Sequence, residues 1–335
     1  MIVGLVLIGL IVIGVWLWAP RERVALFWRT DSGRFTVDKP LEDLTTADLR
    51  ALREQIAEQE AEYPDVTDGA EKAIRFSAES RPKRTPYVVL YIHGFSATRQ
   101  EISPIPETIA QNLHANYYAT RLTGHGLDGE ALAAATPSDW IFDVMEAWQV
   151  ARQLGDQVIV IATSTGATLA TWLAQQHQVQ PYLAALLMVS PNFQPGHWAT
   201  PMFLWPLARR WLPRLSGPTY GWEPSNDLGA KYWTYRYPVS AVYGMAALVK
   251  AVRNSNLEAI TAPTLFIYSD DDQVVSALYT DRAMKRWGAD IKHRIAVAAK
   301  PNDNNHVIAG DIVRPEATEQ RLADMMSFLK TNVIS

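Results

Sequence analysis

Short apolar runs, separated by longer mixed segments, dominate the chain from residue 87 onward. The runs are rich in β-branched and aromatic residues, and most are apolar without a break rather than alternating with polar positions. Continuous runs of this kind are typical of strands buried on both faces of a sheet. The predicted strands are Tyr87–Gly94, Val158–Ala162, Leu183–Ser190, Thr264–Asp270 and His293–Ala299, with a weaker candidate beginning at Asn116.

Most of the segments between these runs are long enough to form a helix. Asp139–Leu154 and Gly166–Gln176 are two of them. Strands that alternate with helices predict an α/β fold with a mainly parallel sheet and helices on both faces. Because open sheets of this class bind ligands beyond the carboxyl ends of their strands, we expect the chemistry where the apolar runs stop.

The first 19 residues are uncharged and almost wholly apolar. As a helix they would span about 27 Å, close to the thickness of a bilayer core. Arg21, Arg23 and Arg29 follow them and no basic side chain precedes them, so the positive-inside rule predicts a cytoplasmic catalytic domain. We therefore expect residues 1–19 to be a single-pass transmembrane anchor in contact with membrane lipid. The alternative is a cleaved signal peptide, but the basic start and the cleavage motif are missing.

Residues 20–72 are predicted to form a juxtamembrane helical segment. Its helix begins near Thr45 or Thr46, either of which is a suitable N-cap. The apolar positions that follow at helical spacing are Leu49, Leu52 and Ile56. This helix packs on the catalytic body in one interpretation and lies along the membrane in the other.

Composition narrows the function classes. The chain has 335 residues, 48% of them hydrophobic, which is enough to bury a sizeable core. A net charge of −4 carries no basic footprint, so nucleic acid is excluded as a partner. The absence of cysteine excludes thiol catalysis and cysteine-bound zinc. No metal or organic cofactor is expected, because no zinc-protease, Walker or dinucleotide motif is present. The sequence assigns no oligomeric state.

Ser164 stands at the sharpest transition in the pattern. A strand ends at Ile161 or Ala162 and a helix starts near Gly166, which leaves only a tight turn for the serine. Such a turn crowds its flanks, and the residues two before and two after Ser164 are small, Ala162 and Gly166. This arrangement indicates a nucleophile elbow, in which the strained turn exposes the hydroxyl above the sheet. The alternative is a Ser/Thr cap at the start of the helix.

A nucleophilic serine needs a base, and the base needs an orienting acid. Among the aspartates that end the strand Thr264–Asp270 we choose Asp272, because it stands closest to the apolar pair Val274 and Val275. An acidic turn or a cation site is the alternative for this triplet. His306, in a polar loop after the last strand, is the candidate base.

His93 and His125 are interpreted as structural hydrogen-bonding residues near the site, because each lies beside a glycine.

From about Ala73 to its end the chain resembles the α/β-hydrolase superfamily, and within it bacterial carboxylesterases and monoacylglycerol lipase-like enzymes. The resemblance is carried by YIHGFSAT (91–98), TRLTGHG (120–126), SDW (138–140), ATSTG (162–166), SDDDQVV (269–275) and NNHVI (304–308), in the order of the family. It implies that Ser164 is the nucleophile, Asp272 the acid and His306 the base. It also implies an oxyanion hole formed by the backbone N–H groups of Phe95 and Thr165. Ala162 departs from the usual first glycine of the elbow motif.

The alternation stops between residues 191 and 256, where the superfamily inserts a cap. The tryptophans there are Trp198, Trp205, Trp211, Trp222 and Trp233. Their number suggests an apolar acyl-binding chamber. We therefore expect a membrane-anchored serine hydrolase that cleaves medium or long acyl esters through an acyl-enzyme. The alternatives are a thioesterase or serine peptidase with the same triad, and a non-catalytic binding protein on the same scaffold. The expected domains are 1–19 (anchor), 20–72 (juxtamembrane), 73–190 and 257–335 (hydrolase core), and 191–256 (cap).

Overall fold

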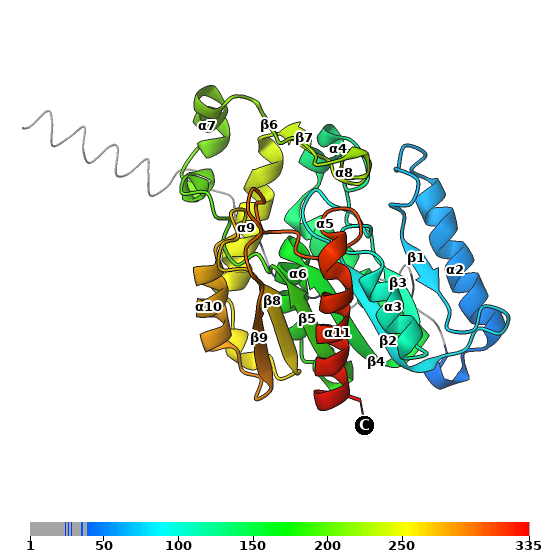
Figure 1. The fold of residues 1–335 in the computed structure, drawn as a ribbon. Helices are drawn as coiled ribbons and strands as arrows, with labels where there is room; N and C mark the ends of the chain where they lie inside the picture. Colours follow the sequence, from blue (N-terminus) through cyan, green and yellow to red (C-terminus); the bar gives the residue numbers. More distant parts are fainter. Residues whose placement is uncertain (1–23, 25, 27, 29–34, 36–38, 335) are drawn as a thin grey trace, which may run out of the picture.

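A seven-stranded sheet forms the centre of the molecule (Figure 1). The computed structural model describes residues 24, 26, 28, 35 and 39–334. The strand order is β1-β3-β2-β4-β5-β8-β9, and every neighbouring pair is parallel except β1 with β3. The strands are β1 (Ala73–Arg75), β2 (Thr85–Ile92), β3 (Asn116–Ala119), β4 (Gly155–Thr163), β5 (Leu183–Val189), β8 (Thr264–Tyr268) and β9 (Lys292–Ala296). The predicted mainly parallel sheet is confirmed.

The central strands are buried on both faces, as their continuous apolar runs indicate. In β4, Val158 and Val160 belong to one hydrophobic cluster, whereas Ile159 and Ile161 belong to another. Successive side chains of a strand point to opposite faces, so the two clusters lie on the two sides of the sheet.

Helices cover both faces. Leu, Trp and Val side chains of α5 (Pro137–Leu154) and α6 (Ser164–Ala174) fill the first cluster. α3 (Ile105–Asn112) and α11 (Pro315–Asn332) fill the second, and Figure 1 shows them together in front of the sheet. α10 (Ala277–Arg286) adds Ala283 to the first cluster. The short elements are η2 (Leu41–Asp43), α4 (Gly129–Ala134), η3 (Gln180–Tyr182) and η5 (Leu257–Ala259).

α2 (Thr46–Ala61) packs on the catalytic body. Thr45 is its N-cap and forms a capping box with Asp48. The apolar positions at helical spacing, Leu49, Leu52 and Ile56, are all buried in the first cluster. Of the two interpretations of this helix, the one in which it packs on the catalytic body therefore agrees with the structure.

The predicted membrane localisation is contradicted. In the described part of the chain, no helix is both long and apolar enough to cross a membrane. The 18-residue helices α5 and α11 carry several charged side chains each, which are costly in a bilayer core. The prediction of a single-pass membrane location with a cytoplasmic catalytic domain is therefore withdrawn. The stretch on which it relied, residues 1–19, lies outside the described residues.

The segment between β5 and β8 lies above the carboxyl ends of the strands (Figure 1). It contains η4 (Thr200–Leu204), α7 (Ala208–Ser216), β6 (Thr219–Gly221), α8 (Asp227–Tyr232), β7 (Arg236–Pro238) and α9 (Ser240–Arg253). β6 and β7 pair as a separate antiparallel hairpin. Trp233 is buried here, whereas Trp198 is 82% and Trp205 50% exposed. The tryptophans therefore do not all face one internal chamber.

The start of α6 contacts the end of β2 closely, and a substitution at this contact tests the packing of the fold. A Cβ at Gly166 would lie 2.3 Å from the carbonyl oxygen of Ile92 and 2.4 Å from that of His93. We expect G166A to lower the free energy of unfolding by about 3 kcal/mol, because backbone must shift to admit the methyl group. Urea unfolding measures this. G229A is the matched control, since its nearest neighbour would be 3.5 Å away and alanine favours helix α8. Equal stability of the two variants would contradict the prediction.

Candidate functional site

Three polar side chains meet beyond the carboxyl ends of three parallel strands. Ser164 follows β4, Asp272 lies in the loop after β8, and His306 lies in the loop after β9. The imidazole Nε2 of His306 is 3.0 Å from Ser164 Oγ, and its Nδ1 is 2.8 Å from Asp272 Oδ2. The structure thus brings together the three side chains singled out in the sequence.

The backbone of Ser164 is in the left-handed region, with φ of 52°. This conformation is strained for a residue with a side chain and marks functional turns. Thr163 is the N-cap of α6, and its side chain makes no capping bond to the helix. The hydroxyl of Ser164 contacts the imidazole of His306 rather than capping the helix, so the geometry is that of an elbow and not of a Ser/Thr cap.

Asp272 differs from the neighbouring aspartates in its surroundings. Its side chain is 1% exposed, and Oδ1 accepts hydrogen bonds from the N–H groups of Val274 and Val275 at 2.8 and 2.9 Å. Asp270 instead forms a surface ion pair with Arg294. The carboxylate of Asp272 is therefore held by the backbone in one orientation toward His306.

The surroundings of His306 and His93 shift the pKa values of the two rings in opposite directions. Burial disfavours the charged ring of His306, but the carboxylates of Asp272 and Glu101 outweigh it and raise its pKa above the usual value. Burial lowers the pKa of His93 to about 4. Its Nδ1 donates to the carbonyl of Gly94 and its Nε2 accepts from the N–H of Leu122, so this ring is a neutral hydrogen-bonding residue.

The loop after β2 lies against the serine. A Cβ at Gly94 would be 3.1 Å from the Cβ of Ser164. Phe95 is the next residue of this loop, and Thr165 is the second residue of α6, where an N–H has no partner within the helix. The two backbone groups proposed for the oxyanion hole therefore belong to two segments near Ser164, the loop after β2 and the start of α6.

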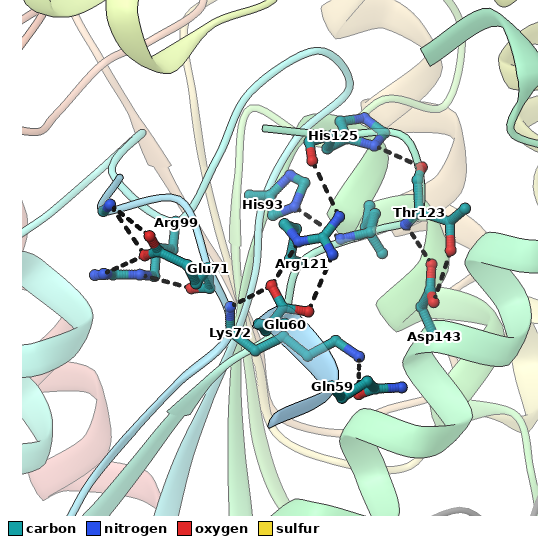
Figure 2. A network of polar contacts seen from close by, with 12 residues as sticks. Gln59, Glu60, Glu71, Lys72, His93, Arg99, Arg121, Thr123, His125 and Asp143 are labelled. Carbon is teal, nitrogen blue, oxygen red and sulfur yellow. Dashed lines mark hydrogen bonds and ion pairs between the residues drawn. The ribbon is translucent and has the colours of Figure 1, made fainter. Parts of the chain in front are cut away.

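A buried polar network supports the loop 120–126, which contacts His93 (Figure 2). Glu60 of α2 forms a double hydrogen-bonded ion pair with Arg121, which also donates to the carbonyl of His125. Asp143 of α5 accepts from the N–H and hydroxyl of Thr123, and burial raises its pKa to about 7. This network links α2 and α5 to the loop that holds His93.

Sequence reasoning missed Glu60, Arg121 and Asp143, which hold the loop 120–126, and Glu101, whose buried carboxylate raises the pKa of His306. Each is a charged residue in a polar or amphipathic stretch, where exposure is the ordinary expectation. Glu60 lies one turn beyond Ile56 on the apolar stripe of α2, and this position was the available signal. For Glu101 the pattern carries no such signal.

Within the residues that the structure describes, no cluster of three histidine, aspartate or glutamate side chains could hold a metal ion. A cavity of about 280 Å³ opens between the loop after β2 and the segment 230–236, lined by Thr98, Leu127 and Trp233 among others. Ser164 is not among its lining residues. The cavity by itself therefore does not define an acyl-binding site.

Comparison with known proteins agrees with this architecture. Residues 89–318 match the Alpha/beta hydrolase family. The thermostable monoacylglycerol lipase of Bacillus sp. (strain H-257) is 28% identical over 216 residues, covering 64% of this chain and 78% of that protein.

Solved structures of lipolytic enzymes share the fold. A structure from work on LipS and LipT, two metagenome-derived lipolytic enzymes, aligns with a TM-score of 0.65 at 20% identity, covering 79% of this chain and 99% of the other. A soluble variant of monoglyceride lipase from Saccharomyces cerevisiae, in complex with a substrate analog, aligns with a TM-score of 0.59 at 11% identity, covering 79% and 92%. From the family match over most of its length, the chain belongs to the alpha/beta hydrolase family as an esterase/lipase-like protein.

Proposed function

We propose that this lipase/esterase-type hydrolase is a serine hydrolase that cleaves carboxylic esters of medium or long acyl chains. The observation that carries the proposal is the continuous line of hydrogen bonds from Ser164 Oγ through His306 to Asp272, at 3.0 and 2.8 Å. A hydroxyl, an imidazole and a buried carboxylate in this order are the parts that acyl transfer needs.

Each of the three residues has a defined role in the proposed reaction. His306 Nε2 takes the proton from Ser164 as the hydroxyl oxygen attacks the ester carbonyl, and the imidazolium then protonates the leaving alcohol. Asp272 holds the Nδ1–H and stabilises the ring while it is charged. A water molecule, deprotonated by the same imidazole, hydrolyses the acyl-enzyme and restores Ser164.

The developing oxyanion is assigned to the backbone N–H groups of Phe95 and Thr165. Each such donor contributes about 3 kcal/mol in the transition state when it is fixed in place before the reaction. Thr165 lies at the N-terminus of α6, whose dipole also favours negative charge.

Lipid monoesters are the substrate class that the comparisons support. The Bacillus relative is a monoacylglycerol lipase, and the yeast structural neighbour is a monoglyceride lipase. The segment between β5 and β8 is rich in aromatic and apolar side chains. Such side chains favour binding of an apolar acyl chain over binding of a polar acyl group.

The proposed function gives three testable predictions, and the first of these concerns the nucleophile. S164A is expected to abolish labelling by a fluorophosphonate probe and to lower kcat for ester hydrolysis about 10⁴-fold or more. The exposed Ser80 gives the control variant S80A, which should label and turn over like the wild type. Labelling of S164A at the wild-type rate would overturn the assignment, because another residue would then be the nucleophile, whereas a wild-type protein that does not label would indicate a binding protein on a hydrolase scaffold.

The second prediction concerns pH. His306 must be neutral to accept the proton, so kcat/KM falls as the pH drops through its pKa. Because the Asp272 carboxylate stabilises the imidazolium, D272N is expected to move this acid limb to lower pH and to lower kcat about 10⁴-fold. D270N is the matched control, since Asp270 pairs with Arg294 at the surface, and both its limb and its kcat should stay unchanged. Equal effects of the two substitutions would contradict the role of Asp272.

The third prediction concerns the substrate. With p-nitrophenyl esters, kcat/KM is expected to rise at least tenfold from acetyl to decanoyl or dodecanoyl, because each buried methylene adds about 0.8 kcal/mol. Matched thioesters and anilides of the best acyl group separate esterase from thioesterase or peptidase activity. Equal turnover of acetyl and dodecanoyl esters would count against the acyl preference.

A further inference from the structure

Glu101 is a buried carboxylate beside the site that the proposed chemistry leaves unused. It lies in the loop between β2 and α3 and is 2% exposed. Its Oε2 accepts two hydrogen bonds, from the N–H of Gly94 at 2.8 Å and from the hydroxyl of Tyr91 at 3.1 Å. In the described part of the chain, no lysine or arginine forms an ion pair with it. Burial raises its pKa to about 7.

The second bond continues to the elbow. The hydroxyls of Tyr91 and Thr163 are 3.1 Å apart. A phenol has one hydrogen to donate, and Tyr91 gives it to Glu101, so the hydroxyl of Thr163 donates to Tyr91. Thr163 is the residue immediately before Ser164. The carboxylate of Glu101 is thus connected both to the loop that carries Phe95 and to the turn that carries Ser164 and Thr165.

The space around Gly94 shows how close these groups are. A Cβ on Gly94 would lie 2.8 Å from Oε1 of Glu101 and 3.1 Å from the Cβ of Ser164. The carboxylate and the serine therefore both pack against the open face of Gly94, where a side chain would otherwise stand.

The backbone of the same segment contacts the loop of His306. A Cβ on Gly310 would meet the carbonyl oxygen of Glu101 at 2.7 Å, and the N–H of Asp311 donates to the carbonyl of Ser103 at 3.0 Å. The segment 101–103 thus contacts both the loop of His306 and the loop that carries Phe95.

We propose that Glu101 is a positioning residue for both halves of the oxyanion hole, holding Phe95 through Gly94 and Thr165 through Tyr91 and Thr163. This inference rests on the proposed serine hydrolase function. Its physical reason is that oxyanion donors stabilise the transition state only when they are fixed before the reaction, and a displacement near 1 Å costs about 10²-fold in rate.

The test separates hydrogen bonding from charge. In E101Q the amide oxygen can replace Oε2 and accept both hydrogen bonds, whereas E101L fills similar space and accepts neither. E101L is expected to lower kcat about 10²-fold per active site with KM changed less than threefold, and E101Q to restore kcat to within about fivefold of the wild type. Y91F, which removes the hydrogen bonds of Tyr91 to Glu101 and Thr163 but leaves that of Gly94, should fall between them.

A trifluoromethyl ketone that forms a tetrahedral adduct on the serine supplies a second readout. Its inhibition constant should rise in E101L by the same factor as kcat falls, because both report binding of the oxyanion. E107L is the matched control, since Glu107 is a nearby buried carboxylate that accepts its hydrogen bond from the hydroxyl of Ser103. It should lower stability without changing kcat per active site, as counted by fluorophosphonate labelling.

Three outcomes would overturn the inference: wild-type kcat in E101L, no recovery in E101Q, or an equal loss in E107L. If E101L does not fold, Y91F decides, and wild-type kcat in that variant contradicts the role. A wild-type protein that neither labels nor hydrolyses esters would refute the proposed function itself, which is a different result.

Discussion

The contact between the start of α6 and the end of β2 is the constraint on which the site depends. The carbonyl oxygens of Ile92 and His93 occupy the space that a side chain at residue 166 would need. Because glycine stands there, α6 begins directly above β2, and the turn before it is short enough to place Ser164 in the left-handed region. The same approach brings the loop after β2 against the serine, so one backbone contact places both Ser164 and the loop that carries Phe95.

Burial and the nearby carboxylates together set the protonation of His93 and His306. His93 is kept neutral, while His306, which is also buried, lies beside the carboxylates of Asp272 and Glu101 and favours its charged form. Two buried imidazoles, one after β2 and one after β9, thus behave differently because carboxylates raise the pKa of only one of them. Of the two rings, that of His306 is the one whose positive charge would be compensated by carboxylates.

The sequence predicted the parts of the fold that depend on long apolar runs. The central strands and the helices α2, α5 and α6 are where the pattern indicated, because burial on both faces leaves an unbroken apolar signature. β1 was missed, since three residues paired at the edge of a sheet carry no periodicity. The tryptophans of the segment 191–256 show the limit of composition, which counts aromatic residues but does not say which of them face outward.

The choice of Asp272 over its neighbours rested on the following valines, and the structure gives this a physical basis. The turn that buries Val275 also directs its N–H, with that of Val274, at the carboxylate. Glu101 had no comparable signal, because its donors come from β2 and the loop after it and are assembled only by the fold. Local patterns thus predict residues whose partners are close in sequence, and they miss carboxylates whose surroundings are tertiary.

The ion pair between Glu60 and Arg121 means that the cooperative unit is larger than the region shared with the family. α2 precedes residue 89, where the family match begins, yet its carboxylate neutralises a guanidinium inside the body. A chain shortened to the shared region would leave that positive charge buried without a partner. This would lower the free energy of unfolding by about 3–5 kcal/mol. Any transplant of this catalytic body onto another protein must therefore take the helix that begins at Thr46 along with it.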